Sequence, residues 1–356
     1  MKKIRFGILS TANIARKNWK SIHDSGNSIV SAVASRDIKR SRQFIEELQA
    51  EAPFETPPAA LGSYEELLAS KSVDAVYIPL PTGLRKEWVL RAAVAGKHVL
   101  CEKPCGLNAS DVQEMIAACK KNRVQFMDGV MFMHNPRLSR VREIFDDGKS
   151  VGQIKRITSS FSFCMAENVY EKNVRLNSQL EPAGCLGDLG WYCIRFTLWA
   201  MNWRLPREVT GRILFQSGSA RSPAQVPMDF SAELIFDEKT SASFYCSFIA
   251  EAQNWVHVSG SIGQLRIDDF VHPLNDHESA FELNRKEIRV KCCDCGAKHS
   301  DSREMAQQAN MIRNFSNQVR SGQLNDEWLE SALKTQRVMD VCLEAARTGT
   351  CLKLGA

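Results

Sequence analysis

The hydrophobic positions in the first third of the chain form short apolar runs that alternate with amphipathic runs. Short continuous apolar runs predict buried strands, and apolar residues three or four positions apart predict helices. Because strands and helices alternate at this spacing, the segment predicts an α/β fold with a doubly wound parallel sheet. The predicted strands are residues 4–9, 29–34, 75–79, 98–101 and 124–127; the predicted helices are residues 14–22, 39–50, 86–95 and 110–121, with a capping box at 63–66 opening a further short helix.

The pattern changes after residue 128. Residues 232–236 and 241–248 alternate apolar and polar positions around a tight turn, which predicts a β-hairpin. We therefore predict an α+β second domain with a large, mostly antiparallel sheet and helices on one face, so that the chain divides into residues 1–128 and 129–356. Its other predicted strands are residues 154–163, 255–260 and 264–268, its helices are residues 135–146, 304–320 and 330–348, and residues 216–227 are a predicted loop.

Length and charge narrow the functional classes. A chain of 356 residues is long enough for two domains, and 44% hydrophobic with 24% charged residues is typical of a globular enzyme. The net charge of +5 comes without a dense Lys/Arg tract interleaved with aromatic residues, so we expect no nucleic-acid partner. No stretch approaches the ~20 apolar residues of a membrane span, so we expect no membrane partner. The mild positive charge is compatible with an anionic cofactor such as a dinucleotide.

The cysteines and the N-terminal segment indicate the compartment. The twelve cysteines are scattered, and most lie inside apolar or helical runs, which indicates reduced thiols rather than a disulfide framework. The apolar run near the N-terminus stops by Ser10, too early for a signal peptide. We therefore expect a cytoplasmic protein.

One cysteine-rich segment has the composition of a metal site but not the spacing. It contains Cys292, Cys293 and Cys295, followed by His299. Zinc sites favour pairs such as Cys-x-x-Cys, which can fold around the ion. We therefore predict an ordinary reduced surface loop and no metal.

The junction between the first predicted strand and helix is where dinucleotide-binding folds place a glycine-rich turn. The backbone there must approach a pyrophosphate, and the helix N-terminus must direct free N–H groups at it. Ser10, Ala12 and Ala15 are small, but none is glycine. The segment is therefore either a cofactor turn or an ordinary strand-to-helix loop. Its candidate cofactor residues are Gly7, Ser10, Thr11, Ala12, Asn13 and Ile14.

The end of the second predicted strand indicates the type of dinucleotide. An acidic side chain there binds the ribose hydroxyls of NAD, whereas a basic one suits the 2′-phosphate of NADP. Ser35 and Arg36 end this strand, and Asp37 follows. We interpret Ser35 and Arg36 as a 2′-phosphate clamp and predict NADP as the cofactor. The alternatives are NAD bound through Asp37 and a merely solvated Arg36; Arg40 is a further candidate near the adenine.

Several motifs resemble those of one enzyme family. They lie at residues 77–88, 95–104, 127–131, 134–137, 184–192 and 260–265, and the most specific is the Gly-Lys-His-Val-x-x-Glu-Lys-Pro element at residues 96–104. Over most of its length the chain resembles the glucose-fructose oxidoreductase / inositol dehydrogenase / MocA (Gfo/Idh/MocA) family. Its Asp188-x-Gly-x-Tyr192 element is most similar to the dihydrodiol dehydrogenase and NADP-dependent xylose dehydrogenase subset.

The resemblance implies an N-terminal Rossmann domain that binds the cofactor and a C-terminal α+β domain that binds substrate. The open sheet face of the second domain often forms a dimer in this family, so we expect a homodimer or homotetramer. We also expect the helix at about 328–348 to pack back on the Rossmann domain. The resemblance adds cofactor contacts at Pro79, Leu80, Pro81, Leu84, Glu102 and Lys103.

The chain departs from the family pattern in two places. The family turn usually carries glycine where Ser10 and Ala12 stand, so the affinity or pose of the cofactor could differ. The family often has histidine where Arg85 stands. A guanidinium there could bind an acidic group of the substrate, which makes Arg85 a candidate substrate residue.

Hydride transfer at a carbinol requires a group that takes or gives the hydroxyl proton. Lys103 follows a strand at the edge where such sheets bind ligands, and in the family this lysine hydrogen-bonds the reacting oxygen. Asp188 and Tyr192 are four positions apart and share one helix face. We predict Tyr192 as general acid/base, Lys103 as polariser of the reacting oxygen, and Asp188 as acceptor for a substrate hydroxyl. An unperturbed tyrosine has a pKa near ~10, so Tyr192 needs a neighbouring cation such as Lys103.

Simpler interpretations exist for these residues. Without the resemblance, Lys103 would be a surface lysine and Tyr192 a packed core residue. His134 could touch substrate or serve as a structural histidine. Pro104 is expected to fix the turn that aims Lys103, with a trans bond as the default.

These features together predict an NADP(H)-dependent oxidoreductase. It would transfer a hydride to or from a carbinol or carbonyl carbon of a small polyhydroxylated substrate such as a sugar, polyol or dihydrodiol. One alternative is an enzyme that holds its nicotinamide tightly and catalyses a net non-redox step, either glycosidic cleavage or epimerisation. The other is a non-catalytic NADP-sensing protein, against which the joint presence of Lys103, Asp188 and Tyr192 argues.

Overall fold

The chain folds into two compact units. The computed structural model describes residues 2–274, 278–291 and 305–354. Of these, the first unit contains residues 2–105, 110–135 and 305–332, and the second unit contains the remainder.

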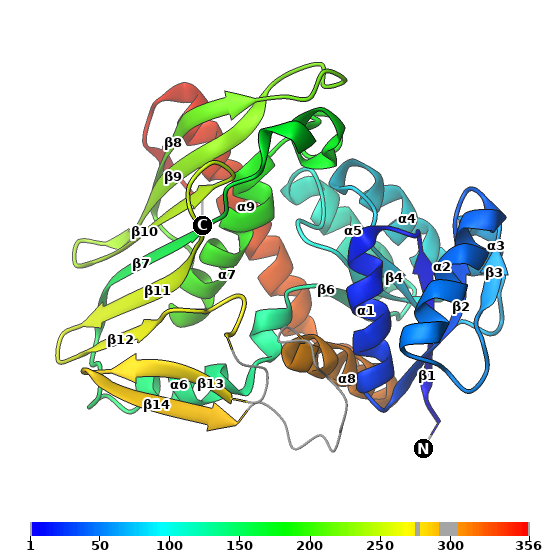
Figure 1. The fold of residues 1–356 in the computed structure, drawn as a ribbon. Helices are drawn as coiled ribbons and strands as arrows, with labels where there is room; N and C mark the ends of the chain where they lie inside the picture. Colours follow the sequence, from blue (N-terminus) through cyan, green and yellow to red (C-terminus); the bar gives the residue numbers. More distant parts are fainter. Residues whose placement is uncertain (1, 275–277, 292–304, 355–356) are drawn as a thin grey trace. The chain divides into compact units, whose positions relative to one another are not determined.

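The first unit is built on a six-stranded parallel sheet (Figure 1). Its strand order, β3-β2-β1-β4-β5-β6, reverses direction between β1 and β4, which is the switch point of a doubly wound fold. The predicted parallel sheet is therefore confirmed. The strands are β1 (Ile4–Leu9), β2 (Ser28–Ala34), β3 (Ala59–Leu61), β4 (Ala75–Ile78), β5 (His98–Cys101) and β6 (Phe126–Asp128).

Helices flank this sheet much as the apolar spacing predicts. Ser63 caps α3 by accepting a hydrogen bond from the backbone N–H of Glu66, which confirms the predicted capping residue. Helix α4 begins earlier than predicted, at Thr82, because Pro81 occupies its N-cap position. The helices are α1 (Asn13–Asp24), α2 (Ile38–Glu51), α3 (Tyr64–Ala69), α4 (Thr82–Val94), α5 (Ala109–Lys121) and the 3₁₀ turn Met131–His134.

A helix from near the end of the chain also belongs to the first unit. Helix α8 (Met305–Ser321) packs on α1 and β1, where the rings of Phe6 and Phe315 lie 5.8 Å apart. The Ser28 and Ser316 hydroxyls, both buried, are 2.7 Å apart. The unit is therefore not continuous in sequence, unlike the predicted division at residue 128.

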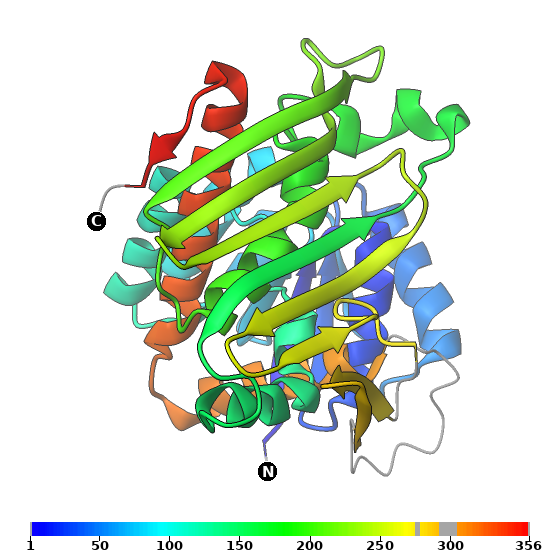
Figure 2. The same cartoon turned by 90° about the vertical axis from the view of Figure 1, so that its left-hand side faces the viewer.

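The second unit is built on a nine-stranded sheet (Figure 2). Its order is β14-β13-β12-β11-β7-β10-β9-β8-β15, in which only the pair of β7 and β10 is parallel. This confirms the mostly antiparallel sheet. The strands are β7 (Ile154–Ser162), β8 (Glu208–Ser217), β9 (Val226–Asp237), β10 (Thr240–Ser247), β11 (Gln253–Gly260), β12 (Gln264–Ile267), β13 (Glu278–Leu283), β14 (Lys286–Lys291) and β15 (Leu352–Lys353).

Helices cover one face of this sheet. They are α6 (Pro136–Asp146), α7 (Trp191–Ala200) and the part of α9 (Asp326–Thr348) that follows Ala332. Every residue of α7 is buried. Helix α9 runs so close to β8 that a Cβ on Gly211 would lie 2.2 Å from the carbonyl oxygen of Cys342. Figure 2 shows the opposite face of the sheet with no helix in front of it.

The expected packing of residues 328–348 on the Rossmann sheet stays a prediction.

Among the described helices, none is both long and apolar enough to cross a membrane.

Candidate cofactor and substrate sites

The turn from β1 to α1 leaves the start of the helix open to an anion. Ala12 occupies the N-cap position with no side-chain hydrogen bond, and the first turn carries no acidic residue. Ser10 has a φ of 130°, a conformation that favours glycine, and its Oγ accepts a hydrogen bond from the backbone N–H of Ala12 at 3.0 Å. An uncapped N-terminus of this kind fits a pyrophosphate. Thr11 and Ala12 are half-buried, and Asn13 and Ile14 are exposed, so the predicted turn residues are accessible.

Gly7 has a packing role instead of a place in the turn. It lies within β1, and a Cβ at this position would be 2.6 Å from Cδ2 of Leu67 in α3. Its glycine character is therefore explained by the close approach of α3 to the sheet.

The end of β2 presents one free basic residue and one engaged acidic residue. Ser35 is buried, whereas Arg36 and Arg40 are exposed. The carboxylate of Asp37 accepts a hydrogen bond from the backbone N–H of Lys39 at 2.9 Å and so caps α2. Asp37 therefore already has a structural role at the position where an NAD enzyme uses its acidic residue.

Tyr64 is a candidate residue that the sequence did not suggest. Its phenol lies near the Ser10 side chain and Arg36. Burial raises the pKa of Tyr64, while Arg36 and Ser10 offset part of that rise. Its ring packs edge-on against Trp88 at 4.9 Å. The capping pattern predicts a role for its neighbour Ser63 but none for Tyr64. Tyr64 becomes a candidate because the fold brings it to the ends of β1 and β2.

The Arg85 side chain forms its hydrogen bonds inside the protein. Its side chain is buried, and Nε donates to the carbonyl oxygen of Leu80 at 2.6 Å. Nη1 donates to Thr82 Oγ1 at 2.9 Å and also to the carbonyl oxygen of Pro104. These bonds join the loop after β4 to the turn after β5, so the geometry favours a structural role over the predicted contact with substrate. In the same loop Pro79, Leu80 and Pro81 precede α4, and Leu84 is 41% exposed.

Lys103 and Glu102 follow β5 at the carboxyl edge of the sheet. Each is only 9% exposed, and the bond between Lys103 and Pro104 is cis, not trans as expected by default. Tyr77 donates to Glu102 Oε1 at 2.6 Å and accepts from Asn18 Nδ2 at 2.7 Å. Burial, followed by the charge of Glu102, raises the pKa of Tyr77 well above its usual range. The carboxylate beside Lys103 is thus fixed from within the first unit.

His134 is held within the first unit. Its Nδ1 lies 3.1 Å from Asn314 Nδ2, and its ring packs edge-on against Trp328 at 6.0 Å. These contacts agree with the structural alternative for this histidine.

In the second unit, Asp188 and Tyr192 lie on consecutive turns that differ in type. Asp188 belongs to a π-helical turn (Leu186–Gly190), and Tyr192 belongs to the first turn of α7. Turns of this π type recur at functional sites. Tyr192 is 6% exposed, and its ring packs edge-on against Phe161 at 5.5 Å.

Arg175 is a second residue that the sequence did not suggest. Its Nε donates to Asp188 Oδ2 at 2.6 Å. The pKa of Arg175 is raised chiefly by Asp188, with smaller contributions from Glu181 and Tyr192. A single guanidinium therefore lies close to both predicted residues of this unit. Residues 164–185 show no periodic pattern that could have indicated it, and the structure places short 3₁₀ turns there (Glu167–Lys172 and Val174–Leu176).

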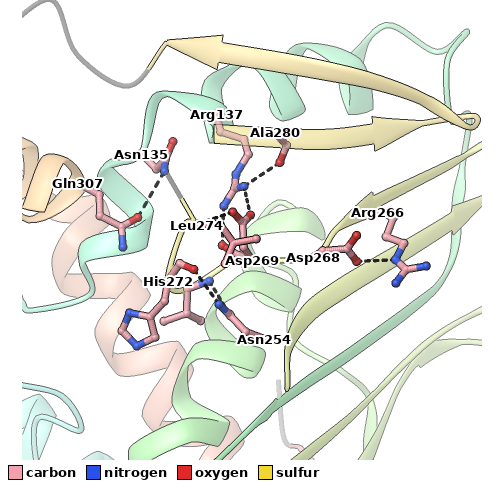
Figure 3. A network of polar contacts seen from close by, with 11 residues as sticks. Asn135, Arg137, Asn254, Arg266, Asp268, Asp269, His272, Leu274, Ala280 and Gln307 are labelled. Atoms are coloured by element: carbon pink, nitrogen blue, oxygen red, sulfur yellow. Dashed lines mark hydrogen bonds and ion pairs between the residues drawn. The ribbon is translucent and has the colours of Figure 1, made fainter. Parts of the chain in front are cut away.

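A buried ion pair supports the segment of residues 269–274 (Figure 3). Arg137, 1% exposed, donates to Asp269 Oδ1 at 2.5 Å and to the carbonyl oxygen of Ala280 at 2.8 Å. Asp269 Oδ2 in turn accepts from the backbone N–H of Leu274 at 2.8 Å. The segment so held carries His272, whose ring lies 5.6 Å from Phe161. Asn254 also binds this segment, through the His272 carbonyl oxygen at 3.0 Å.

The predicted absence of a metal site concerns Cys292, Cys293, Cys295 and His299, which lie outside the described residues. Within the described ranges, no group of three or more His, Cys, Asp or Glu side chains is placed to hold a metal ion. None of the nine cysteines described there forms a disulfide.

Two family profiles match consecutive parts of the chain. Residues 4–130 match the oxidoreductase family with an NAD-binding Rossmann fold, and residues 138–266 match the Gfo/Idh/MocA C-terminal domain. The two profiles meet where the first unit gives way to the second.

Named relatives span most of the chain. D-xylose 1-dehydrogenase (NADP(+)) 2 of Haloferax volcanii is 29% identical over 98% of this chain and 99% of its own length. Trans-1,2-dihydrobenzene-1,2-diol dehydrogenase of Mus musculus is 30% identical over 80% of each chain.

Solved structures share the fold at lower identity. A 3-ketoreductase from Actinomadura kijaniata, solved with TDP-benzene and NADP, superposes with a TM-score of 0.80 at 24% identity over 98% of each chain. The aldose-aldose oxidoreductase of Caulobacter crescentus gives a TM-score of 0.80 at 23% identity over 99% of this chain and 100% of its own. Profiles, relatives and fold agree with the motifs at residues 96–104 and 184–192, and the chain therefore belongs to the Gfo/Idh/MocA family of NAD(P)-dependent oxidoreductases.

Proposed function

We propose that the protein is an NADP(H)-dependent oxidoreductase that interconverts a carbinol and a carbonyl on a sugar, polyol or dihydrodiol. The observation that carries this proposal is the presence of two features in a member of a dehydrogenase family: a Lys103 turn at the carboxyl edge of the parallel sheet in the first unit, and a Tyr192 phenol near a guanidinium that binds a carboxylate in the second unit. The xylose and dihydrodiol dehydrogenases named above support the substrate class.

The preference for NADP rests on the ends of β1 and β2. Asp37 caps α2, so a ribose hydroxyl would have to compete with a backbone N–H for its carboxylate. Arg36 is exposed beside Tyr64 and Ser10, which together offer one cation and two hydroxyls to a 2′-phosphate. The uncapped start of α1 suits the pyrophosphate. Once bound, the nicotinamide supplies or accepts the hydride.

The protein's own residues handle the proton. Tyr192 takes the carbinol proton in oxidation and returns it in reduction, Lys103 polarises the reacting oxygen, and Asp188 accepts a bond from a substrate hydroxyl. Tyr192 needs a neighbouring cation to ionise, and we assign that role to the Lys103 ammonium. The Actinomadura kijaniata ketoreductase has been solved with a tyrosine replaced and with a lysine replaced, which are the residue types of this assignment.

A second candidate function follows from the relative named aldose-aldose oxidoreductase. An enzyme of that kind would keep its nicotinamide bound and show turnover without net change of cofactor. Absorbance at 340 nm separates the two, because only the first function consumes or produces free NADPH.

The test is a substrate screen with purified protein, NADP(H), and a panel of D-xylose, D-glucose, uronates and dihydrodiols. We expect NADPH-coupled turnover with at least one neutral polyhydroxylated compound. Turnover without net NADPH change would establish the second function. NADPH binding without any turnover would support the non-catalytic sensor.

We further propose that the open face of the nine-stranded sheet joins two or four copies of the chain. Tyr245 and Trp255 stand on either side of Ser160 on this face, and aromatic residues are enriched at interfaces. A depression of about 680 Å³ is lined by these residues together with Arg212 and Glu233. The cytoplasmic location is proposed from the sequence alone.

A further inference from the structure

Arg175 is fixed on one side and open on the other. Its Nε is bound to Asp188 Oδ2 at 2.6 Å, which sets the plane of the guanidinium. Its two Nη groups have no hydrogen-bond partner among the residues that the structure describes, and its side chain is 45% exposed. The structure thus presents up to four N–H donors from a guanidinium that is already oriented.

The surroundings of Arg175 are electrically compensated. Asp188 is in direct contact, and Glu181 is close enough to raise the pKa of Arg175 as well. One guanidinium near two carboxylates has little net attraction for an anion, but its N–H groups still donate to neutral oxygens. The Tyr192 phenol also lies within electrostatic range of the same guanidinium.

We infer that Arg175 is a substrate-contacting specificity residue, whose Nη groups bind a neutral hydroxyl adjacent to the carbon that reacts at Tyr192. This inference rests on the proposed function, because it takes Tyr192 as the group that meets the reacting oxygen. In this inference Arg175, and not Arg85, is the arginine that recognises substrate. The substrate group that it recognises is a neutral hydroxyl and not an acidic group.

The experiment compares sugars that differ by one hydroxyl. NADP-coupled oxidation of D-glucose, 2-deoxy-D-glucose and 3-deoxy-D-glucose is measured for the wild-type protein and for Arg175→Gln. In the wild type, removal of the recognised hydroxyl should lower kcat/KM by about 10- to 100-fold, the range for a hydrogen bond to a charged group. In Arg175→Gln, the ratio of kcat/KM between D-glucose and the same deoxy sugar should fall to within a few-fold. With D-glucose itself, Arg175→Gln should lose kcat/KM mainly through a higher KM, because a bond to a non-reacting hydroxyl is made before and during hydride transfer.

A second comparison tests the charge of the recognised group. D-glucuronate carries a carboxylate where D-glucose carries a neutral carbinol. Arg175→Gln should not lose more activity with D-glucuronate than with D-glucose. A selective loss with D-glucuronate would overturn the neutral-hydroxyl assignment and make Arg175 an anion site.

Controls separate recognition from structure. Arg207→Gln removes another arginine of the second unit whose side chain pairs with a carboxylate, Glu238 at 3.0 Å, on the exposed surface, and its kinetics should match the wild type. The Kd for NADPH and the thermal midpoint should be unchanged in Arg175→Gln, and Arg175→Lys should restore the discrimination only in part.

Failure of the inference about Arg175 and failure of the proposed function give different experimental results. If the wild type oxidises glucose and Arg175→Gln keeps full discrimination against both deoxy sugars, the inference is wrong and the proposed function stands. If the wild type oxidises none of these sugars nor any compound of the substrate panel, the proposed function falls and the inference falls with it.

Discussion

Ser10 shows how one residue can be held in an unfavourable conformation for a local gain. Its φ of 130° belongs to a region used almost only by glycine, while its hydroxyl oxygen accepts a hydrogen bond from the backbone N–H of Ala12. Ser10→Ala removes this bond and keeps the strain, whereas Ser10→Gly removes both. We therefore expect Ser10→Gly to be more stable than Ser10→Ala by about 1–3 kcal/mol, measured by urea denaturation. Equal stabilities would show that the turn is not strained.

Lys103 is the residue on which the chemistry depends most. Lys103→Met keeps the stem of the side chain and removes the ammonium, so we expect kcat to fall by about 10²- to 10⁴-fold. The Kd for NADPH, measured by fluorescence, should change little. Lys86→Met is the matched control, because Lys86 pairs with Asp111 and Glu114 on the surface of the same unit. An active Lys103→Met protein would remove the proposed mechanism.

Arg36 should decide between the two dinucleotides. Arg36→Ala deletes a charge-assisted bond that only NADPH can make, so we expect NADPH affinity to fall about 10- to 100-fold and NADH affinity to change little. Titration of both cofactors into wild type and variant measures this. Arg42→Ala, an exposed arginine on α2, is the control. Equal losses for both cofactors would contradict the 2′-phosphate assignment.

At the scale of elements, the Arg137–Asp269 pair holds the segment that carries His272. Removal of one partner leaves a buried charge, so Arg137→Met should lower the free energy of unfolding by about 3–5 kcal/mol. Arg140→Met breaks an exposed pair with Glu143 and should cost less than about 1 kcal/mol. Thermal or urea unfolding distinguishes them. A similar small effect for both would mean that Arg137 is not anchoring this segment.

Elements with a continuous apolar run or a regular alternation could be predicted from the sequence, and elements that are very short or largely exposed could not. Continuous apolar runs gave β1, β4 and β5, and the alternation around residues 237–240 gave the hairpin of β9 and β10. Strand β3 has only three residues, and none is fully buried, so it leaves no apolar run. Strand β8 exposes most of its side chains, and β13 and β14 pair with each other at the sheet edge. The predicted loop at 216–227 is correspondingly shorter than expected, since β8 runs to Ser217 and β9 starts at Val226.

The residues of the candidate site likewise divide into those that sequence motifs predict and those that only the fold reveals. Motifs contiguous in sequence identify Lys103, Asp188 and Tyr192 as candidates, and their roles stay predictions. Tyr64 and Arg175 depend on contacts between elements distant in sequence, such as the approach of α3 to Ser10, and no local pattern encodes these. Arg85 shows the reverse case, because its side chain binds carbonyl oxygens that the sequence does not reveal; the geometry favours a structural role, and the contact with substrate stays a prediction.

At the scale of the whole molecule, the open sheet face should determine assembly. Trp255→Glu places a charge among the aromatic and hydroxyl groups of that face, so we expect the variant to elute as a monomer with unchanged NADPH affinity. Light scattering after size-exclusion chromatography gives the mass. Val94→Glu, at an exposed apolar residue of the first unit, should assemble like the wild type. A monomeric wild type, or a dimeric Trp255→Glu, would rule out this face.

The place of α8 has a consequence for how the protein is made. Phe6 and Ser28 lie near the start of the chain, and their buried partners Phe315 and Ser316 come close to its end. The nucleotide-binding sheet therefore emerges from the ribosome long before the helix that covers β1 exists. Until α8 has been synthesised, that apolar surface must be shielded by other means, so a nascent chain halted before residue 305 is expected to be a chaperone client rather than a finished domain.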